Sequence, residues 1–361
     1  MTDSIPADST PVEPTPVESG SAEPSPVDSG PADSGHVEPS RVDSDPADSG
    51  PADLSPADSS PADSSPADSS PVEPPPVAPG TAGPNGVGIG PRIGVGREAE
   101  VYAWGPDAVV KLYRSGFDGH HNEALALAGL AGYRVAPALV DVVTRDGRPG
   151  LVLERVAGAD MLDVLRRRPW QVRALARTLA ETHLAVHEVL GPADLPDVRQ
   201  VLAARIDDAT LSRELRGFAL RLLDGLPSGD RLCHGDYHPG NVMVGGDRVS
   251  VIDWPNAARG VPEADHARAI LLLQWADPLP AAPYVGRRGG PGLARRGLIA
   301  AGRSMLTRGY ALTYADGAPG ELHDLESWLV VHAAARLSEG VAAERARLLD
   351  WLVRAQHAFE T

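Results

Sequence analysis

The sequence predicts an α+β fold of two lobes, a small, mostly antiparallel β lobe followed by a larger helical lobe, with a disordered repeat tail in front. Three observations lead to this prediction. A five-residue repeat without apolar bulk occupies residues 6–75. Short apolar runs with a two-residue period follow as far as residue 156, which is typical of strands. Beyond that point the apolar residues recur with helical spacing, which predicts that the rest of the chain is mainly helical.

The tail consists of pentapeptide repeats. Fourteen copies of the type Pro-Ala/Val-Asp/Glu-Ser/Pro-Ser/Gly/Thr fill residues 6–75, and a linker rich in proline and glycine follows at 76–86. Nearly all repeats offer at most one small apolar side chain, so burial cannot offset the entropy lost on ordering. We therefore predict that residues 1–86 are disordered. They are interpreted either as an interaction or solubilising tail or as a repeat expanded without a specific role.

Removal of residues 1–80 is expected to leave the thermal unfolding midpoint of the protein unchanged. The repeats offer little apolar surface to pack on the rest of the chain, and their charges are screened within about 10 Å at ordinary salt. Calorimetric unfolding of the full-length and shortened chains measures this directly. A cooperative loss of folding in the shortened chain would contradict the predicted disorder.

Charge is distributed unevenly along the chain. The first 80 residues carry 16 acidic residues and one basic residue, Arg41, so −15 of the net charge of −16 lies there. The remaining part is nearly neutral, which argues against nucleic acid or an anionic membrane as a partner. No apolar run could span a bilayer and no signal peptide is visible, so we expect a cytoplasmic protein. The single cysteine, Cys233, is interpreted as a buried apolar residue without a role.

The predicted β lobe opens with a glycine-rich strand–turn–strand. Gly94 and Gly96 lie in the run IGVGREAEVY, residues 93–102. Small residues at these positions let a backbone approach phosphate groups closely. The next element is a second strand, at 108–113, and not the helix that a dinucleotide-binding turn requires. We therefore expect a phosphate-covering loop between two strands.

The second strand carries Lys111, the only lysine of the protein beside 32 arginines. A compact ammonium group can bridge two phosphates where a guanidinium is too large, so this lysine indicates phosphate binding. The alternative is a solvent-facing lysine on an edge strand. A helical pattern with Glu123 near its start follows, and then two strands, at about 138–143 and 151–156, complete the predicted β lobe.

The helical lobe begins after Gly158. A long helix is predicted from about 172 to 190, and His183 on its apolar face is interpreted as a hydrogen-bonded core histidine. Apolar residues with helical spacing predict four more helices near the C-terminus, at 265–275, 293–315, 321–337 and 341–357.

The run from His234 to Trp254, HGDYHPGNVMVGGDRVSVIDW, separates the first of these helices from the others. Two alternating apolar stretches around Gly-Gly-Asp predict a β-hairpin. Asn241 enters the hairpin and Asp253 leaves it, each six residues from Asp247, so antiparallel pairing is expected to bring their side chains together. An amide oxygen beside a carboxylate suits Mg²⁺ with its phosphate ligands. Asp236 is then a candidate base for a hydroxyl group that attacks a phosphate.

The pattern HGDxHxxN, followed by a hairpin and Ile252-Asp253-Trp254, resembles the aminoglycoside phosphotransferase and choline kinase-like family, which has a protein-kinase-like fold. The glycine loop, the lysine, the helix glutamate and the strands occur in the order of that family. The resemblance implies a nucleotide-binding N-lobe with a hinge at 87–156 and a C-lobe with the catalytic loop and substrate site at 157–361.

The resemblance also implies a role for each matching residue of the nucleotide site. Lys111 would hold the α- and β-phosphates of ATP, and Glu123 would orient the lysine. Gly94 and Gly96 would cover the phosphates. The hinge backbone would meet adenine at Glu154 and Val156.

In the catalytic loop, the resemblance implies that Asn241 and Asp253 hold Mg²⁺ and that Asp236 is the catalytic base. His234 and His238 would support the loop by hydrogen bonds. Asp265, at the start of the next helix, would brace the loop without taking part in the chemistry.

Together these features predict a kinase that moves the γ-phosphate of ATP to a hydroxyl group of a small molecule, such as an aminoglycoside or another hydroxylated metabolite. Only eight residues, 254–261, separate Asp253 from Pro262, which is too short for the activation loop and peptide platform of a protein kinase. Four acidic residues are considered as contributors to an acceptor pocket: Glu263, Glu321, Asp324 and Glu326.

The alternative is a catalytically silent nucleotide-binding regulator that uses its N-terminal tail to recruit a partner. Such a regulator needs only residues that bind nucleotide. The joint presence of Lys111, Asp236, Asn241 and Asp253 argues against it.

Overall fold

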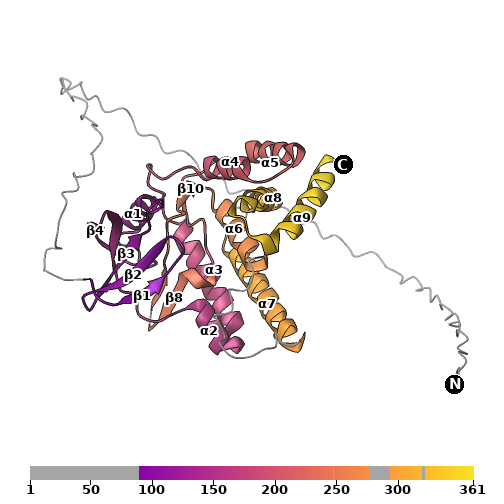
Figure 1. Ribbon diagram of the computed structural model, residues 1–361. Coiled ribbons are helices and arrows are strands. Elements are labelled where there is room, and N and C mark those ends of the chain that lie inside the picture. Colours follow the sequence, from indigo (N-terminus) through magenta and orange to yellow (C-terminus); the bar gives the residue numbers. More distant parts are fainter. Residues whose placement is uncertain (1–88, 247, 276–292, 319–321) are drawn as a thin grey trace, which may run out of the picture. The chain divides into compact units, whose positions relative to one another are not determined.

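The computed structural model describes residues 89–246, 248–275, 293–318 and 322–361 (Figure 1). The predicted tail at 1–86, the turn residue Asp247 and the acidic residue Glu321 lie outside the described residues. Everything below concerns the described part of the chain.

A five-stranded antiparallel sheet forms the first lobe, with the strands in the order β1-β2-β3-β5-β4 (Figure 1). On the central strand β3, Val110 and Leu112 pack with Val152 on one face of the sheet. Because side chains alternate along a strand, Lys111 between them points to the other face, toward α1. The elements of this lobe are β1 (Arg92–Val95), β2 (Ala99–Trp104), β3 (Ala108–Tyr113), α1 (His120–Gly129), β4 (Leu139–Arg145) and β5 (Arg148–Glu154).

Helices dominate the second lobe, where α3 packs along α7 and α6 packs against α8. Three helices are capped at their N-terminal ends by a side chain that accepts a backbone N–H of the first turn. The capping residues are Asp160, Asp197 and Ser212. The helices are α2 (Met161–Arg167), η1 (Pro169–Gln171), α3 (Val172–His187), α4 (Val198–Asp208), α5 (Arg213–Gly225), α6 (Pro262–Trp275), α7 (Leu293–Gly317), α8 (Leu325–Arg336), η3 (Leu337–Glu339) and α9 (Ala342–Glu360).

Two small sheets hold the loop that contains the HGDxHxxN pattern. Strand β7 (Arg231–Cys233) precedes this loop and pairs with β10 (Ala258–Gly260). After the loop and the short helix η2 (Pro239–Asn241), β8 (Val242–Gly245) pairs with β9 (Arg248–Val251) as the predicted hairpin. Strand β6 (Ala159–Asp160) adds to the other edge of β8. The loop is thus fixed at both ends by backbone pairing.

The register of this hairpin corrects one expectation. Gly245 pairs with Arg248 and Val242 with Val251, so the centre of the hairpin lies between residues 246 and 247 and not at 247. Asn241 therefore stands opposite Ile252, whose N–H donates to the Asn241 carbonyl at 2.9 Å, and not opposite Asp253. The turn has two residues, and a turn of even length shifts the pairing by one. Asn241 and Asp253 still leave the same end of the hairpin.

Most predicted elements are present, with shifted ends. Strand β5 begins at Arg148, directly after the turn, and stops at Glu154 instead of residue 156. Helix α6 begins three residues before the predicted start, at Pro262, because proline is well suited to the first helical position. None of the described helices combines the length and the apolar character needed to cross a membrane. The predicted two-lobe α+β fold is confirmed.

Candidate active site

Lys111 lies in the middle of the β sheet. Its backbone pairs with Val101 of β2 on one side and Leu151 of β5 on the other, and the residue is 8% exposed. The alternative of a solvent-facing lysine on an edge strand is therefore wrong. Its Nζ lies 2.5 Å from Oε2 of Glu123 and 2.5 Å from Oδ1 of Asp253. One ammonium group thus joins the sheet, α1 and the segment that follows the hairpin.

These two carboxylates determine the charge of the lysine. Burial by itself lowers the pKa of Lys111, but the negative charges of Glu123 and Asp253 outweigh burial and raise the pKa above its usual value. Lys111 is therefore a cation in the folded protein. The hydroxyl of Tyr113, two residues along the same strand, also donates to Glu123 Oε2. The Glu123 carboxylate, which is buried, is held by two donors and can orient the lysine.

The glycine-rich turn connects β1 and β2. The N–H of Gly96 donates to the carbonyl of Ala99 at 2.8 Å, and a Cβ at position 96 would lie 3.3 Å from that carbonyl. At Gly94 a Cβ would meet only ordinary van der Waals contacts, so this position requires a glycine less strictly than position 96 does. Burial, followed by the negative charge of Asp253, raises the pKa of Glu98 at the tip. The tip thus shares an electrostatic environment with Asp253.

The predicted hinge follows β5. The N–H of Glu154 donates to the Ala138 carbonyl at 2.9 Å, and the N–H of Arg155 donates to the Asp107 carbonyl at 2.8 Å. The Glu154 carboxylate accepts from Arg248 of β9 at 2.5 Å. This ion pair connects the end of the sheet to strand β9 of the hairpin. The side chain of Glu154 therefore has a structural role. Val156, two residues further along, is half-buried.

The predicted catalytic loop, residues 234–241, is anchored on Asp265, near the start of α6. The buried Asp265 carboxylate accepts the backbone N–H of His234 at 2.5 Å and that of Gly235 at 2.9 Å. Gly235 has a φ of 75°, and a Cβ there would lie 2.3 Å from the Asn256 carbonyl, so only glycine fits. This geometry agrees with the bracing role that the resemblance implies for Asp265.

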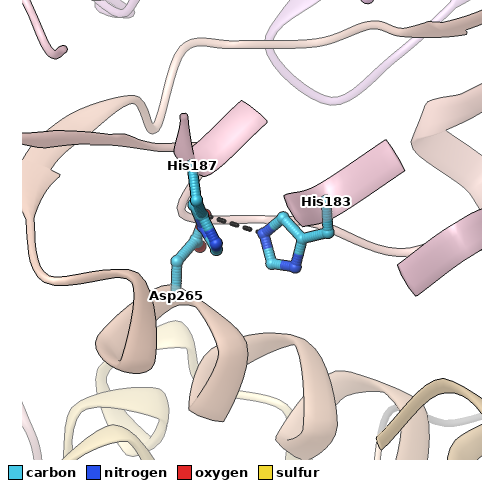
Figure 2. A group of neighbouring side chains, drawn as sticks. All are labelled: His183, His187 and Asp265. Carbon is cyan, nitrogen blue, oxygen red and sulfur yellow. Dashed lines mark hydrogen bonds and ion pairs between the residues drawn. The ribbon is translucent and has the colours of Figure 1, made fainter. Parts of the chain in front are cut away.

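Two histidines of α3 reach the same carboxylate (Figure 2). His183 Nε2 and His187 Nε2 lie 3.1 and 3.3 Å from Asp265 Oδ2, and their Nδ1 atoms each lie 2.7 Å from a hydroxyl, that of Tyr310 and that of Tyr314 respectively. An ionised carboxylate can only accept, so both Nε2 atoms carry a proton and both tyrosines donate.

The ligand atoms of His183, His187 and Asp265 lie within 4.8 Å of one another, as in a metal site. Each ring nitrogen and both carboxylate oxygens already have a hydrogen-bond partner, however, so the group is complete without an ion. Burial raises the pKa of Asp265, but the two histidines outweigh it and hold the pKa well below its usual value. The interpretation of His183 as a hydrogen-bonded core histidine is confirmed.

Acid is expected to destabilise this protein between pH 6.5 and 5, above the range where carboxylates titrate. Burial lowers the pKa of His183 and His332 to about 3 and that of His266 to about 2. A histidine with a depressed folded pKa contributes stability that is complete above its unfolded pKa of roughly 6.5 and is lost as the pH falls. At pH 5 each of the three histidines lowers the free energy of unfolding by about 2 kcal/mol relative to neutral pH.

Urea unfolding at a series of pH values measures this loss. His332→Leu removes a buried imidazole whose Nε2 has no hydrogen-bond partner among the described residues, so the pH slope should fall by about one proton. His357→Gln, at an exposed position of α9, is the matched control and should leave the slope unchanged. A stability that is constant from pH 7 to 5 would contradict the prediction.

Asp236 lies in the loop with about a third of its side chain exposed. Its N–H donates to His234 Nδ1 at 3.2 Å, so the Nε2 atom of His234 carries the proton that bonds to the Ile252 carbonyl at 3.1 Å. His238 Nε2 and an Arg268 nitrogen lie 3.6 and 3.7 Å from the two carboxylate oxygens. Burial raises the pKa of Asp236, but His238 and Arg268 outweigh it, so the pKa is lowered and the group is a carboxylate.

Asn241 and Asp253 offer the oxygen atoms that suit a hard cation. Asn241 Nδ2 donates to the Asp236 carbonyl at 3.0 Å, which commits the amide nitrogen and not the amide oxygen. Asp253 has a φ of 70°, which is rare outside glycine, and its side chain is about half exposed. Trp254 is buried and donates to the Val251 carbonyl, which fixes the chain directly after Asp253. An amide oxygen and a carboxylate fit Mg²⁺.

The structure joins the central predicted residues in two groups of direct contacts. Lys111 joins Glu123 and Asp253 through ion pairs, and Asn241 bonds to the backbone of Asp236 and Ile252. Of the other predicted residues, Gly94 lies in β1 and Gly96 in the turn that follows it, while Glu154 ends β5 and Val156 lies two residues beyond.

The sequence pattern does not single out two residues of the site, and it misplaces one. Glu263, considered for an acceptor pocket, is buried and accepts the N–H of Asp324 at 2.9 Å, so it is used in helix packing. His187 and Arg268 were not considered. The spacing of four residues from His183 to His187 and of three from Asp265 to Arg268 places each pair on one helix face, and this was the available signal.

The chain matches a known enzyme family. The model of the phosphotransferase enzyme family (APH) matches residues 90–299. A search of curated proteins found no match.

Among solved structures, a thermostable mutant of the aminoglycoside phosphotransferase APH(4)-Ia, in a ternary complex with ADP and hygromycin B, is 14% identical to this chain. The match covers 75% of this chain and 93% of that one, with a TM-score of 0.52. The apo form of such a mutant is 16% identical over 75% and 94% of the two chains, with a TM-score of 0.51. A choline/ethanolamine kinase family protein from Mesorhizobium loti is 18% identical over 75% and 87%, with a TM-score of 0.44. The first two likenesses support the fold.

Proposed function

Since the chain belongs to the phosphotransferase enzyme family and is a small-molecule phosphotransferase, we propose that it transfers the γ-phosphate of ATP to a hydroxyl group of its acceptor. The observation that carries this proposal is the single ammonium of Lys111 between Glu123 and Asp253, at 2.5 Å from each. A buried cation held at the junction of sheet and hairpin is suited to the phosphates of a nucleotide.

The nucleotide is proposed to lie between the sheet and the hairpin. Lys111 would contact its α- and β-phosphates, and Gly94 in β1 and Gly96 in the β1–β2 turn would cover them. At the hinge, the N–H groups of Glu154 and Arg155 are committed to the sheet. The carbonyl of Glu154 and the N–H of Val156 are therefore the proposed contacts to the adenine base.

Asn241 and Asp253 are proposed to hold Mg²⁺. Bound there, the cation would neutralise charge on the phosphate groups and bring them toward the catalytic loop. The proposal is supported by the amide bond from Asn241 to the Asp236 carbonyl, which fixes the side chain, and by the half-exposed Asp253 carboxylate.

Asp236 is proposed as the catalytic base. As the hydroxyl oxygen of the acceptor forms its bond to the γ-phosphorus, the bond from that phosphorus to the β-phosphate oxygen breaks, ADP leaves, and the hydroxyl proton passes to the Asp236 carboxylate. The lowered pKa makes Asp236 a weak base toward a free alcohol. It would therefore align the hydroxyl first and take its proton late, as a loose phosphoryl-transfer transition state allows.

A screen of hydroxylated acceptors tests the proposal. Purified protein with MgATP should release ADP faster in the presence of its acceptor, and aminoglycosides should be included among sugars, amino alcohols and other hydroxylated metabolites. Asp236→Asn provides the background, because transfer should fall by roughly 10² to 10⁴ in it while ATP still binds. Binding of MgATP without transfer to any acceptor or hydrolysis would favour the nucleotide-binding regulator that recruits a partner through its tail.

A further inference from the structure

Arg268 of α6 contacts the catalytic loop at Gly235 and Asp236. Its side chain is buried, with 5% of its surface exposed. The Nε atom donates to the Gly235 carbonyl at 3.3 Å, and one terminal nitrogen lies 3.7 Å from Asp236 Oδ1. A single guanidinium thus reaches both the peptide group before Asp236 and its carboxylate.

The same terminal nitrogen donates to Oε1 of Glu339, in η3, at 2.6 Å, so it lies between two carboxylates. Glu339 also accepts from Arg336 at 2.6 Å, and Arg336 forms a two-pronged ion pair with Glu344 of α9 at 2.6 and 2.9 Å. Charges of alternating sign therefore run from Asp236 to α9. The last three members, at 336–344, lie beyond the segment 90–299 that the family model matches.

We propose that Arg268 is a positioning residue for phosphate transfer, which orients the catalytic carboxylate of Asp236 and is itself held by the C-terminal part of the chain through Glu339. This proposal rests on the proposed function of Asp236. The planar guanidinium has several donors in a rigid fork, so it can hold two loop groups and an anchor at once. At 3.7 Å the contact with Asp236 is an ion pair without a hydrogen bond, which leaves the carboxylate free to accept from a substrate hydroxyl.

Two identical substitutions test the proposal. Arg268→Gln and Arg336→Gln each remove a buried arginine and a 2.6 Å ion pair with Glu339, but only Arg268 contacts the catalytic loop. Both variants should therefore lose stability in urea unfolding. Misplacement of a catalytic group costs roughly 10²-fold in rate, so Arg268→Gln should lose about that factor in kcat, with MgATP hydrolysis as the assay if no acceptor is known. Its KM for MgATP should change by less than about threefold, and Arg336→Gln should keep its kcat within the same limit.

Hydrogen exchange of the peptide 234–241 provides a readout that does not need activity. Exchange of these amides should rise in Arg268→Gln and stay near the wild-type level in Arg336→Gln. Equal losses of kcat, or equal gains of exchange, in the two variants would mean that Arg268 forms only a structural ion pair, and would overturn the proposal. An unchanged kcat in Arg268→Gln would overturn it as well.

If the wild type neither hydrolyses MgATP nor transfers its phosphate, the proposed function fails, and hydrogen exchange alone decides whether Arg268 orders the loop. Should Arg268→Gln not fold, Arg268→Lys replaces it in both measurements. The lysine keeps the charge, but one ammonium cannot reach the Gly235 carbonyl and Glu339 together. Arg268→Lys is therefore expected to differ from Arg336→Gln in kcat and in hydrogen exchange in the same direction as Arg268→Gln, but by a smaller amount.

Discussion

Asp236→Asn is expected to bind MgATP at nearly wild-type strength and to transfer phosphate roughly 10² to 10⁴ times more slowly. Asparagine has the shape of aspartate, and the backbone bonds of this position, to His234 Nδ1 and from Asn241 Nδ2, do not involve the side chain that changes. The loop should therefore keep its conformation. Only the carboxylate that receives the hydroxyl proton is lost.

Asp253→Asn should fail in a different way. It removes the charge that faces Mg²⁺ and the ion pair with Lys111, so MgATP binding should weaken and turnover should fall with it. Calorimetric titration of MgATP into both variants, beside an assay of ADP release, separates the two roles. Equal losses of binding in the two variants would contradict the assignment of Asp236 as base and Asp253 as metal ligand.

Lys111→Arg is expected to abolish nearly all phosphate transfer while the fold survives. Lys111 is enclosed in the middle of the sheet, with one ammonium between Glu123 and Asp253. A guanidinium keeps the positive charge, but it is larger and planar, and it cannot contact both carboxylates and two phosphates from the same place. Loss of one preorganised charge contact at a transferring group costs roughly 10² to 10³ in kcat.

Steady-state kinetics of Lys111→Arg and urea unfolding check this expectation together. Arg92→Lys, the opposite exchange in an exposed ion pair of the same sheet, is the control and should change neither rate nor stability measurably. Lys111→Met should lose stability as well as activity, because it leaves Glu123 buried without its cation, a loss of about 3 to 5 kcal/mol. Near-normal turnover of Lys111→Arg would remove the lysine from the proposed phosphate site.

The sequence alone predicted the features that depend on local pattern. Two-residue and helical periods located the strands and helices, and the lone lysine marked β3 as a functional strand. The hairpin followed from Gly-Gly-Asp between alternating apolar residues, although its register was predicted one residue away from the observed one. A turn of two residues and one of three have the same signature in the sequence, and only the backbone pairing of Val242 with Val251 distinguishes them.

The tertiary structure decided which side chains meet. The sequence contains Lys111 and Asp253 as separate residues 142 positions apart, and the fold makes them an ion pair. Asp265 accepts from the backbone of His234 and from His183 of a distant helix, and Arg268 finds Glu339 in the C-terminal part. Periodicity reports only the face of an element on which a residue lies, because it reflects burial within that element. The partner depends on how distant elements pack, and packing is a property of the whole fold.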